Sequence, residues 1–169
     1  MAGPFDERQQ AQFDAELLKI LARYPDGHKA AAMLPALWLV QSILGWVPVP
    51  AMELVASRLG VTPARAREVA TFYVMYHTEP KGQHVLDVCT NISCSLCGAE
   101  NALAYLEKQL GIKAGQTTND KKIHLREAEC LASCGTGPML QVDGGEYVEN
   151  LTPKKIDELV ARLRSDERP

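Results

Sequence analysis

Apolar residues in the first half of the chain recur every three or four positions, which is the spacing of one face of a helix. Proline and glycine interrupt this pattern at intervals that suit helix boundaries. The pattern predicts four helices, over residues 14–23, 29–44, 50–59 and 63–75. We therefore expect the N-terminal half to be a helical domain.

Individual residues set the expected faces and ends of these helices. Leu17, Leu18 and Leu21 are expected on the buried face of the first helix. Pro35 is expected to bend the second helix, because an interior proline removes a backbone donor. Gly60 is expected to end the third helix, because glycine readily adopts the left-handed conformation of a C-terminal cap.

The pattern changes after residues 79–82, Glu-Pro-Lys-Gly, which is the best candidate for a linker. The second half predicts a strand over 85–89, a helix over 96–110, a strand over 122–126, a hairpin of 139–142 and 146–149, and a helix over 153–163. This order is typical of a thioredoxin-like α/β domain. The expected fold class is α+β, with a helical domain over 1–80 followed by a thioredoxin-like domain over 81–169.

Charge and composition exclude some functions. The chain has 169 residues, 46% hydrophobic and 23% charged, which suits a globular protein. Its net charge of −3 argues against a nucleic-acid partner, because such proteins carry a basic surface. The first residues have no basic and apolar secretory pattern. We therefore expect a cytoplasmic protein whose cysteines stay reduced unless they bind a metal.

Residues 30–52 contain no charged side chain, which raises the question of a membrane span. This segment contains three prolines, and its apolar residues fit a buried amphipathic helix that stops near Gly45. No direct insertion into a membrane is expected.

The five cysteines lie in the second half of the chain. Cys89 and Cys94 follow the first predicted strand, with four residues between them. Cys130 and Cys134 lie in a loop before the hairpin, with three residues between them. Both loops can lie at one end of a small sheet, which would bring four thiols together and leave Cys97 over.

Four thiols from two loops suit a [2Fe–2S] cluster, a structural zinc ion or two disulfides. Zinc sites favour Cys-x2-Cys pairs, which these two pairs lack, and a reducing cytoplasm disfavours disulfides. Small residues in the second loop would let backbone amides approach sulfur: Ala132, Ser133, Gly135, Thr136 and Gly137. The spacing favours the two-iron cluster and leaves zinc and redox thiols as alternatives.

The redox alternative has a specific form. Cys94 and Cys97 make a Cys-x-x-Cys at the start of the helix predicted over 96–110, where the helix dipole would lower a thiol pKa. This interpretation leaves the other three cysteines unexplained. Cys97 is otherwise expected as a small buried apolar residue.

Three segments resemble the 24 kDa/E subunit family of respiratory NADH:quinone oxidoreductase (complex I), a family of thioredoxin-like [2Fe–2S] ferredoxins. Residues 88–96, VCTNISCSL, are similar to its first cluster loop. Residues 129–134, ECLASC, followed by Gly137-Pro138-Met139, are similar to its second loop. Residues 68–76, EVATFYVMY, resemble its signature helix, and the likeness extends over about residues 10–165.

The resemblance implies a [2Fe–2S] ferredoxin domain after a helical domain. It implies four cluster ligands, Cys89, Cys94, Cys130 and Cys134. Two positions depart from the family pattern, since Ala132 stands where glycine is common and Gly137 where alanine is common.

A cluster of this kind exchanges single electrons, whereas NADH delivers a hydride, so a flavin is needed between them. The chain has no Gly-x-Gly-x-x-Gly turn, so FMN and NADH are expected on a partner. The resemblance implies the same larger flavoprotein subunit, within the peripheral arm of a membrane-bound complex on the cytoplasmic face. The chain is then an enzyme subunit without catalysis of its own. Trp38 and Trp46 are expected either to dock on the partner or to pack in the helical core.

Other functions are weaker alternatives. The equivalent subunit of an NAD-dependent formate dehydrogenase or hydrogenase shares the same motifs. Residues 52–73 resemble a helix-turn-helix with Arg65 and Arg67 available for phosphate, but acidic residues interrupt them. The four histidines have no shared spacing that suggests a metal site.

Overall fold

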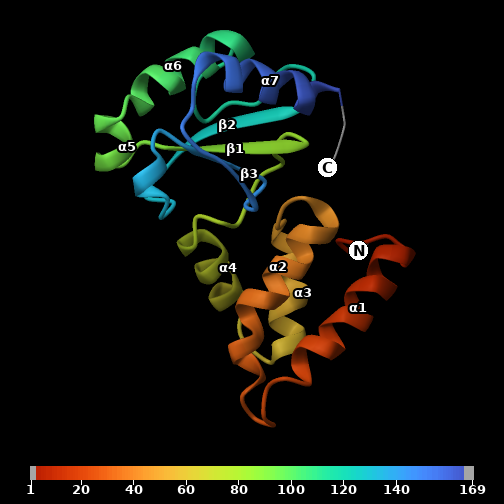
Figure 1. Cartoon of the computed structure of the whole chain (residues 1–169). Coiled ribbons are helices and arrows are strands. Elements are labelled where there is room, and N and C mark those ends of the chain that lie inside the picture. The colour runs from red at the N-terminus through yellow and green to blue at the C-terminus, as the bar shows by residue number, and fades with distance from the viewer. Residues whose placement is uncertain (1–2, 166–169) are drawn as a thin grey trace. The chain divides into compact units, whose positions relative to one another are not determined.

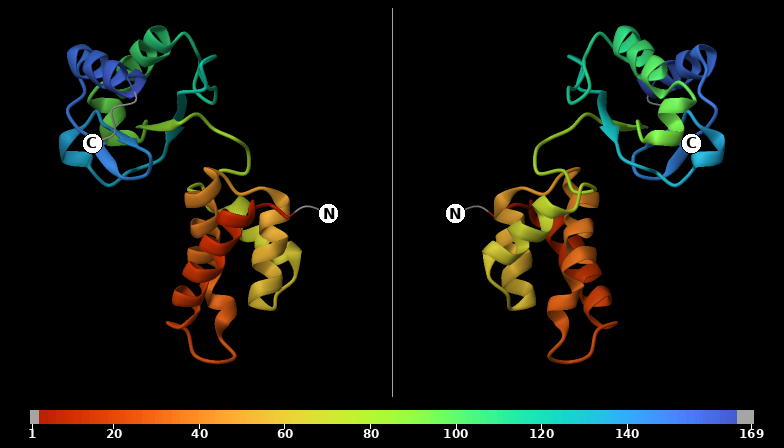
Figure 2. Two further views of the ribbon diagram at one scale, coloured as in Figure 1. Left: turned by 90° about the vertical axis from the view of Figure 1, so that its right-hand side faces the viewer. Right: turned by 90° about the vertical axis from the view of Figure 1, so that its left-hand side faces the viewer.

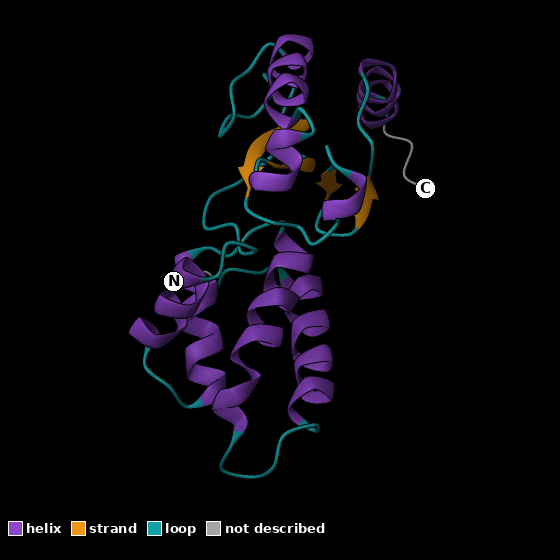
Figure 3. Ribbon diagram, turned by 60° about the vertical axis from the view of Figure 1, so that its left-hand side comes forward, coloured by secondary structure: helices purple, strands orange, loops and turns teal. Residues whose placement is uncertain are grey.

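The computed structural model describes residues 3–165. The chain divides into two compact units, of which the first ends at Pro80 and the second begins at Lys81. The named strands all belong to the second unit, as Figure 3 shows in orange. The α+β class predicted from the sequence is confirmed.

The first unit consists of helices around one apolar core. Its elements are α1 (Glu7–Leu21), η1 (Lys29–Ala32), α2 (Met33–Leu44), α3 (Val49–Leu59) and α4 (Pro63–Phe72). Figure 2 shows these helices side by side, coloured from red to yellow. Phe13, Leu37, Val40 and Val55 are completely buried between them. Each such side chain contributes about 2 kcal/mol of transfer free energy, so this core is the main stabilising element of the unit.

The first helix differs from the prediction. It begins at Glu7 because Asp6 and Gln9 form reciprocal caps, in which the Gln9 amide donates to the Asp6 carboxylate at 2.8 Å. Leu18 was predicted on the buried face, and this is wrong, because its side chain is 69% exposed. Phe13, Leu17 and Ile20 form the buried face instead, at spacings of four and three residues.

Two further helix boundaries correct the prediction. Pro35 does not bend a helix, since α2 begins at Met33 and the proline falls in its first turn, where a missing N–H loses no partner. The helix α4 ends at Phe72 rather than at Met75, because the backbone becomes extended at Tyr73. Gly60 ends α3 in the left-handed conformation, as predicted.

The second unit has a mixed four-stranded sheet. Its elements are β1 (His84–Cys89), α5 (Ile92–Leu96), α6 (Ala99–Leu110), β2 (Ile123–Ala128), η2 (Cys134–Thr136), β3 (Leu140–Val142), β4 (Glu146–Val148) and α7 (Pro153–Arg164). The strand order is β2-β1-β3-β4. β1 is parallel to β2 and antiparallel to β3, and β3 and β4 form the predicted hairpin.

The helices α6 and α7 cover one face of this sheet (Figure 1). Leu86 and Leu125 of the strands pack there against Leu106 of α6 and Ile156 of α7, and all four side chains are buried. On β1 the alternate residues also lie buried, including Asp87, which forms an ion pair with Arg126 of β2. Because β1 is buried along its full length, its last residue, Cys89, is held rigidly.

The helix predicted over 96–110 corresponds to α6, which begins three residues later, at Ala99, whereas Leu96 belongs to the preceding α5. α5 ends at Leu96 and α6 begins at Ala99, because Gly98 between them has a φ of 93°. Leu96 is 85% exposed and does not belong to the core. In the part of the chain that the structure describes, none of the helices has the length and apolar character needed to cross a membrane.

Candidate metal centre

The sheet topology brings the two cysteine loops to one edge. β1 and β2 are parallel neighbours in register, so Cys89 at the end of β1 lies beside Ala128 at the end of β2. The chain leaves both strands at this edge, because parallel strands end on the same side. Cys94 is the third residue of α5, which is separated from the end of β1 by two residues, and Cys130 follows β2.

The four thiols form two neighbouring pairs. Cys89 and Cys94 are buried, and the Cys94 thiol donates a hydrogen bond to the Cys89 sulfur. Cys130 and Cys134 are exposed, and their sulfur atoms lie 3.5 Å apart. The charge of Cys134 raises the pKa of Cys94, and the charge of Cys89 raises the pKa of Cys134, so the two pairs are near enough to affect one another.

Burial and neighbouring thiols raise the pKa of Cys94 and of Cys134, which favours their protonated forms when no metal is bound. Burial raises the pKa of the Cys94 thiol to about 11, and the hydrogen bond to Cys89 adds to the effect. The Cys130 thiol, through its hydrogen bond and its charge, raises the pKa of Cys134. A positive ion would reverse this preference, so metal binding at these thiols must release protons.

Hydrogen-bond donors already point at the sulfur atoms. The Met139 amide donates to Cys94, and the Ser93 hydroxyl donates to Cys134. The Ala132 amide donates to the Cys130 sulfur at 3.4 Å. A donor to sulfur stabilises negative charge there, and the thiolate is the form that binds metal.

The structure shows the surroundings of the two positions that depart from the family pattern. Ala132 has a φ of 64°, in the left-handed region where glycine is the favoured residue. Gly137 leaves room for the first pair, because a Cβ there would lie 3.2 Å from the Cys94 sulfur. Glycine at 137 therefore widens the space around Cys94 relative to alanine.

Cys97 does not behave as predicted. Its side chain is exposed, so the expectation of a buried apolar residue is wrong. It lies at the C-terminal end of α5, and α6 begins only at Ala99, so the pair Cys94–Cys97 is not at the start of a long helix. Burial raises the pKa of Cys94, which is opposite to the lowering that the dithiol alternative predicted.

The two thiol pairs can be compared with the ligand sets of metal centres. Among residues 3–165, no group of three or more histidine, cysteine, aspartate or glutamate side chains is arranged around a single ion. Two thiolates on one tetrahedral ion with bonds near 2.3 Å lie about 3.8 Å apart, close to the spacing of the Cys130–Cys134 pair. An all-cysteine [2Fe–2S] cluster needs four thiolates for two irons, which is what two adjacent pairs supply.

Residues of the second loop and the segment after β4 form a polar network that the sequence patterns did not reveal. The Thr136 hydroxyl donates to Glu149 Oε1 at 2.7 Å, and the Ser133 hydroxyl donates to the same oxygen. Glu149 lies beyond the whole β3–β4 hairpin from Cys134, so no local motif links them. Only the pairing of β3 with β4 brings this carboxylate to the loop.

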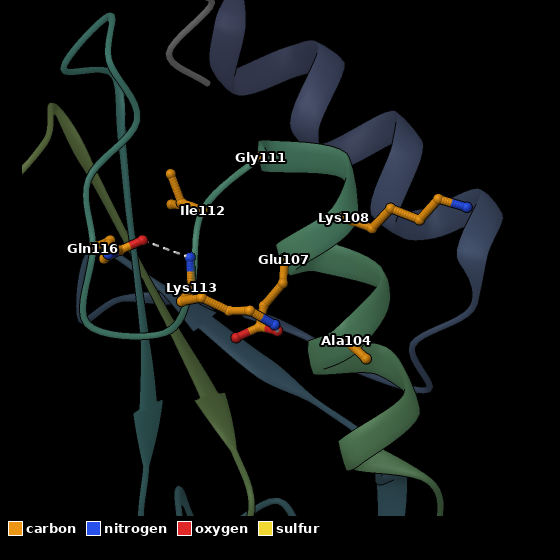
Figure 4. A pocket seen from close by; sticks show the side chains of 7 residues that line it. All are labelled: Ala104, Glu107, Lys108, Gly111, Ile112, Lys113 and Gln116. Atoms are coloured by element: carbon orange, nitrogen blue, oxygen red, sulfur yellow. Dashed lines mark hydrogen bonds and ion pairs between the residues drawn. The ribbon is translucent and has the colours of Figure 1, made fainter.

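The second unit also has a shallow hollow of about 350 Å³ beside the end of α6. Glu107, Lys113 and Gln116 line it, as Figure 4 shows. Lys113 Nζ lies 2.6 Å from Glu107 Oε2, and the Lys113 amide donates to Gln116 Oε1 at 2.9 Å. These polar groups satisfy one another, and the described lining contains no cysteine.

An exposed apolar group lies on the first unit. Four consecutive residues at the end of α4 and after it, from Phe72 to Met75, are between 40% and 81% exposed, and Trp38 of α2 is 46% exposed. Gln41 holds this segment, since its side chain donates to the Met75 carbonyl at 2.9 Å and accepts from the His77 amide at 2.6 Å. Trp46 is half-buried. We call Trp38 and residues 72–75 the aromatic patch.

The helix-turn-helix alternative finds little support in the side chains. Arg65 is paired with Glu68 at 2.7 Å, so one of the two candidate phosphate contacts is already occupied.

Two of the histidines predicted as ordinary residues are buried and hydrogen-bonded. His84 Nδ1 lies 2.8 Å from Asp143 Oδ2, and His124 Nδ1 lies 2.8 Å from Thr117 Oγ1.

Comparison with known proteins gives consistent matches. The family model for thioredoxin-like [2Fe-2S] ferredoxins matches residues 17–164. An E-type subunit of the NADH-quinone oxidoreductase of Rhizobium meliloti is 43% identical over 153 residues, which cover 90% of this chain and 89% of the relative. NADH-quinone oxidoreductase subunit 2 of Thermus thermophilus is 38% identical over 166 residues, covering 98% of this chain and 89% of the relative.

A solved structure supports the fold. An NAD+-reducing [NiFe]-hydrogenase in the air-oxidised state is similar with a TM-score of 0.71 and 19% identity, over 80% of this chain and 23% of that one. At this identity the likeness shows the arrangement of the elements alone. The family match covers most of the chain, and the two relatives match nearly all of their own length as well. The chain belongs to the thioredoxin-like [2Fe–2S] ferredoxin family and, within it, to the E-type subunits of NADH:quinone oxidoreductase.

Proposed function

We propose that Cys89, Cys94, Cys130 and Cys134 hold a [2Fe–2S] cluster, and that the chain exchanges single electrons with the FMN of a partner subunit in the NADH-oxidising module of respiratory NADH:quinone oxidoreductase. The observation that carries the proposal is the pairing of these four thiols at the shared end of two parallel strands. The family to which the chain belongs consists of [2Fe–2S] ferredoxins, which supports the choice of cluster.

The chain's own groups prepare this site. When bound, a [2Fe–2S] cluster accepts and releases one electron at a time. The buried end of β1 fixes Cys89, and α5 returns Cys94 to it. Amide and hydroxyl donors from Met139, Ser93 and Ala132 stabilise negative charge on sulfur, and such hydrogen bonds are one control of cluster potential.

The proposed partner is a flavoprotein subunit that binds FMN and NADH. NADH gives up two electrons as hydride, and a flavin is the cofactor that links hydride chemistry to single-electron carriers. The chain has no dinucleotide-binding turn, so the flavin and NADH sites are proposed on the partner. The relatives at 43% and 38% identity are named as subunits of NADH-quinone oxidoreductase, which favours this complex over a hydrogenase or formate dehydrogenase. We place the module in the peripheral arm, on the cytoplasmic face.

The aromatic patch is the proposed contact of the helical unit with that flavoprotein. Exposed apolar groups of this kind mark protein interfaces, whose cores are rich in aromatic residues. The Gln41 side chain fixes the patch in place, so little ordering entropy is lost when it is covered.

The decisive experiment is anaerobic purification of the chain, followed by assays of iron and acid-labile sulfide and by EPR before and after reduction with dithionite. About two irons and two sulfides per chain, with a signal that appears only on reduction, are expected. Stoichiometric zinc, or a chain that takes up no iron under reconstitution with ferrous iron and sulfide, would contradict the proposal.

A further inference from the structure

Glu149 follows directly after β4 and is joined to the loop that carries Cys134. Its Oε1 atom accepts the hydroxyls of Ser133 and Thr136, which stand on either side of Cys134 in the chain. The two hydroxyl oxygens also lie 2.7 Å from each other. A single carboxylate oxygen therefore holds both flanks of one cysteine.

The backbone around Glu149 strengthens this link. The Asn150 amide donates to the Thr136 carbonyl at 2.8 Å, and the Leu151 amide donates to the Pro138 carbonyl at 2.8 Å. Lys155 of α7 donates from Nζ to the Glu149 carbonyl at 2.7 Å. The segment after β4 is thus fixed by α7 on one side and by the cysteine loop on the other.

The charge on Glu149 is stabilised by the same contacts. The Ser133 and Thr136 hydroxyls hold the pKa of the Glu149 carboxyl below its ordinary value, and the positive charge of Lys155 acts in the same direction. Glu149 is therefore ionised at neutral pH, and hydrogen bonds to an ionised acceptor are roughly twice as strong as those between neutral groups.

Movement of this loop would affect both thiol pairs. The loop continues from Thr136 through Gly137 to Met139, whose amide donates to Cys94 and whose carbonyl accepts the Cys89 amide at 3.1 Å. A loop released at Ser133 and Thr136 would shift Cys134 directly and would loosen the donor to Cys94. Loss of the Glu149 contacts would therefore affect Cys94 as well as Cys134.

We propose that Glu149 is a positioning residue for the metal centre, which acts through Ser133 and Thr136 to hold Cys134 in the place where it binds metal. This inference rests on the proposed function, because it concerns the same four cysteines. Glu149 lies outside both cysteine motifs, after the hairpin. Sequence patterns therefore do not indicate its role.

The chain offers a matched control. Glu146 is the first residue of β4, three positions before Glu149, and its carboxylate is bound by Arg162 at 2.7 and 2.8 Å rather than by the cysteine loop. The variants to compare are Glu149→Ala, Glu149→Gln and Glu146→Ala, each loaded with iron and sulfide in the same way. Glu149→Gln keeps the shape and one acceptor oxygen, so it also guards against a folding defect.

We expect Glu149→Ala to lose iron to a chelator about tenfold faster than the unchanged chain, as is usual when a residue that orients a metal ligand is removed. The EPR g-values of Glu149→Ala should also shift. In both the rate of iron loss and the g-values, Glu149→Gln should lie between Glu149→Ala and the unchanged chain, and Glu146→Ala should match the unchanged chain. The double variant Ser133→Ala/Thr136→Val should lose iron at the same increased rate as Glu149→Ala. Adding Glu149→Ala to the double variant should not increase this rate further. Equal g-values and equal rates of iron loss in Glu149→Ala and Glu146→Ala would overturn the inference.

A second readout separates this inference from the proposed function. Hydrogen exchange of the amides of residues 130–139 can be measured in the cluster-free full chain, and it should be faster in Glu149→Ala than in Glu146→Ala. If the unchanged chain holds no cluster, the proposed function fails, and this exchange still decides whether Glu149 holds the loop. Unchanged exchange in Glu149→Ala would refute the positioning role.

Discussion

Gly137 lies close to Cys94 in the candidate metal centre: a methyl group on Gly137 would be 3.2 Å from the Cys94 sulfur and 3.3 Å from its Cα. Gly135, which precedes it in the same loop, has open space where a Cβ would lie. The two glycines therefore differ in what a side chain would meet, although they share a loop.

Gly137→Ala is expected to retain the cluster and to change its EPR g-values, because Cys94 must give way by a few tenths of an ångström. Gly137→Val should lower the iron content, since a larger side chain cannot be accommodated by so small a shift. Gly135→Ala is the control and should leave both properties unchanged. A normal spectrum in all three variants would show that Cys94 is not confined by this loop.

The Ser93 hydroxyl is expected to raise the reduction potential of the centre. It donates to the Cys134 sulfur, and a donor to sulfur stabilises the more negative, reduced state. Ser93→Ala should therefore lower the potential in a dye-linked redox titration. Ser95→Ala is the control, because the Ser95 hydroxyl donates to Glu100 at 3.2 Å rather than to sulfur. An equal potential in both variants would refute this role.

Substitution of the cysteines should separate the proposed ligands from Cys97. Cys97→Ser is expected to keep about two irons per chain and an unchanged spectrum, because its exposed thiol lies outside the two pairs. Cys94→Ser should lower the iron content or shift the spectrum strongly, because a buried hydroxyl replaces a thiolate. Loss of iron in Cys97→Ser with normal iron in Cys94→Ser would reverse the assignment.

The aromatic patch should govern association rather than stability. Phe72→Ser and Val74→Ser remove side chains that are 76% and 81% exposed, so the free energy of unfolding should change by no more than about 0.5 kcal/mol. Co-purification with the flavoprotein subunit should weaken by about tenfold or more, as for residues at an interface centre. Leu18→Ser is the control, since Leu18 is also exposed and lies on α1. Equal binding of all three variants would exclude the patch as the contact.

The Glu107–Lys113 contact should make stability depend on pH in the acid range. The hydrogen bonds from Lys113 and from the Ala114 amide lower the pKa of Glu107 in the folded chain. A carboxyl with a lowered folded pKa stabilises the protein above its unfolded value of about 4.3, and this stabilisation is lost as the pH falls through the folded pKa. The difference in unfolding free energy between the unchanged chain and Glu107→Gln should therefore shrink as the pH is lowered below about 4. A difference that is constant with pH would contradict this account.

Local signals in the sequence predicted the element order well. Gly60 after α3 and the Asp143-Gly144 turn of the hairpin adopt the left-handed conformation, because the physics of caps and tight turns lies within a few residues. The strand before Cys89 was also predictable, because an apolar run of that length between turn signals suits a buried strand.

Long-range packing decided what local signals left open. The sequence pattern did not distinguish Leu18 from Leu17 as the buried residue of α1, since the choice depends on which face meets the other helices. Gly98 separates α5 from α6 in the left-handed conformation, although the sequence has helical spacing on both sides of it.

Some features of the candidate metal centre were predictable from the sequence, and others depended on the tertiary structure. The sequence by itself determined the cysteine spacing, the small residues between them and the family that these motifs indicate. Only the tertiary structure showed that Cys89 and Cys94 are buried, set Gly137 against the Cys94 sulfur and brought Glu149 to the second loop. Most of these contacts join residues from different elements of the second unit. Their geometry is fixed by strand pairing and core burial, which no short segment of the chain encodes on its own.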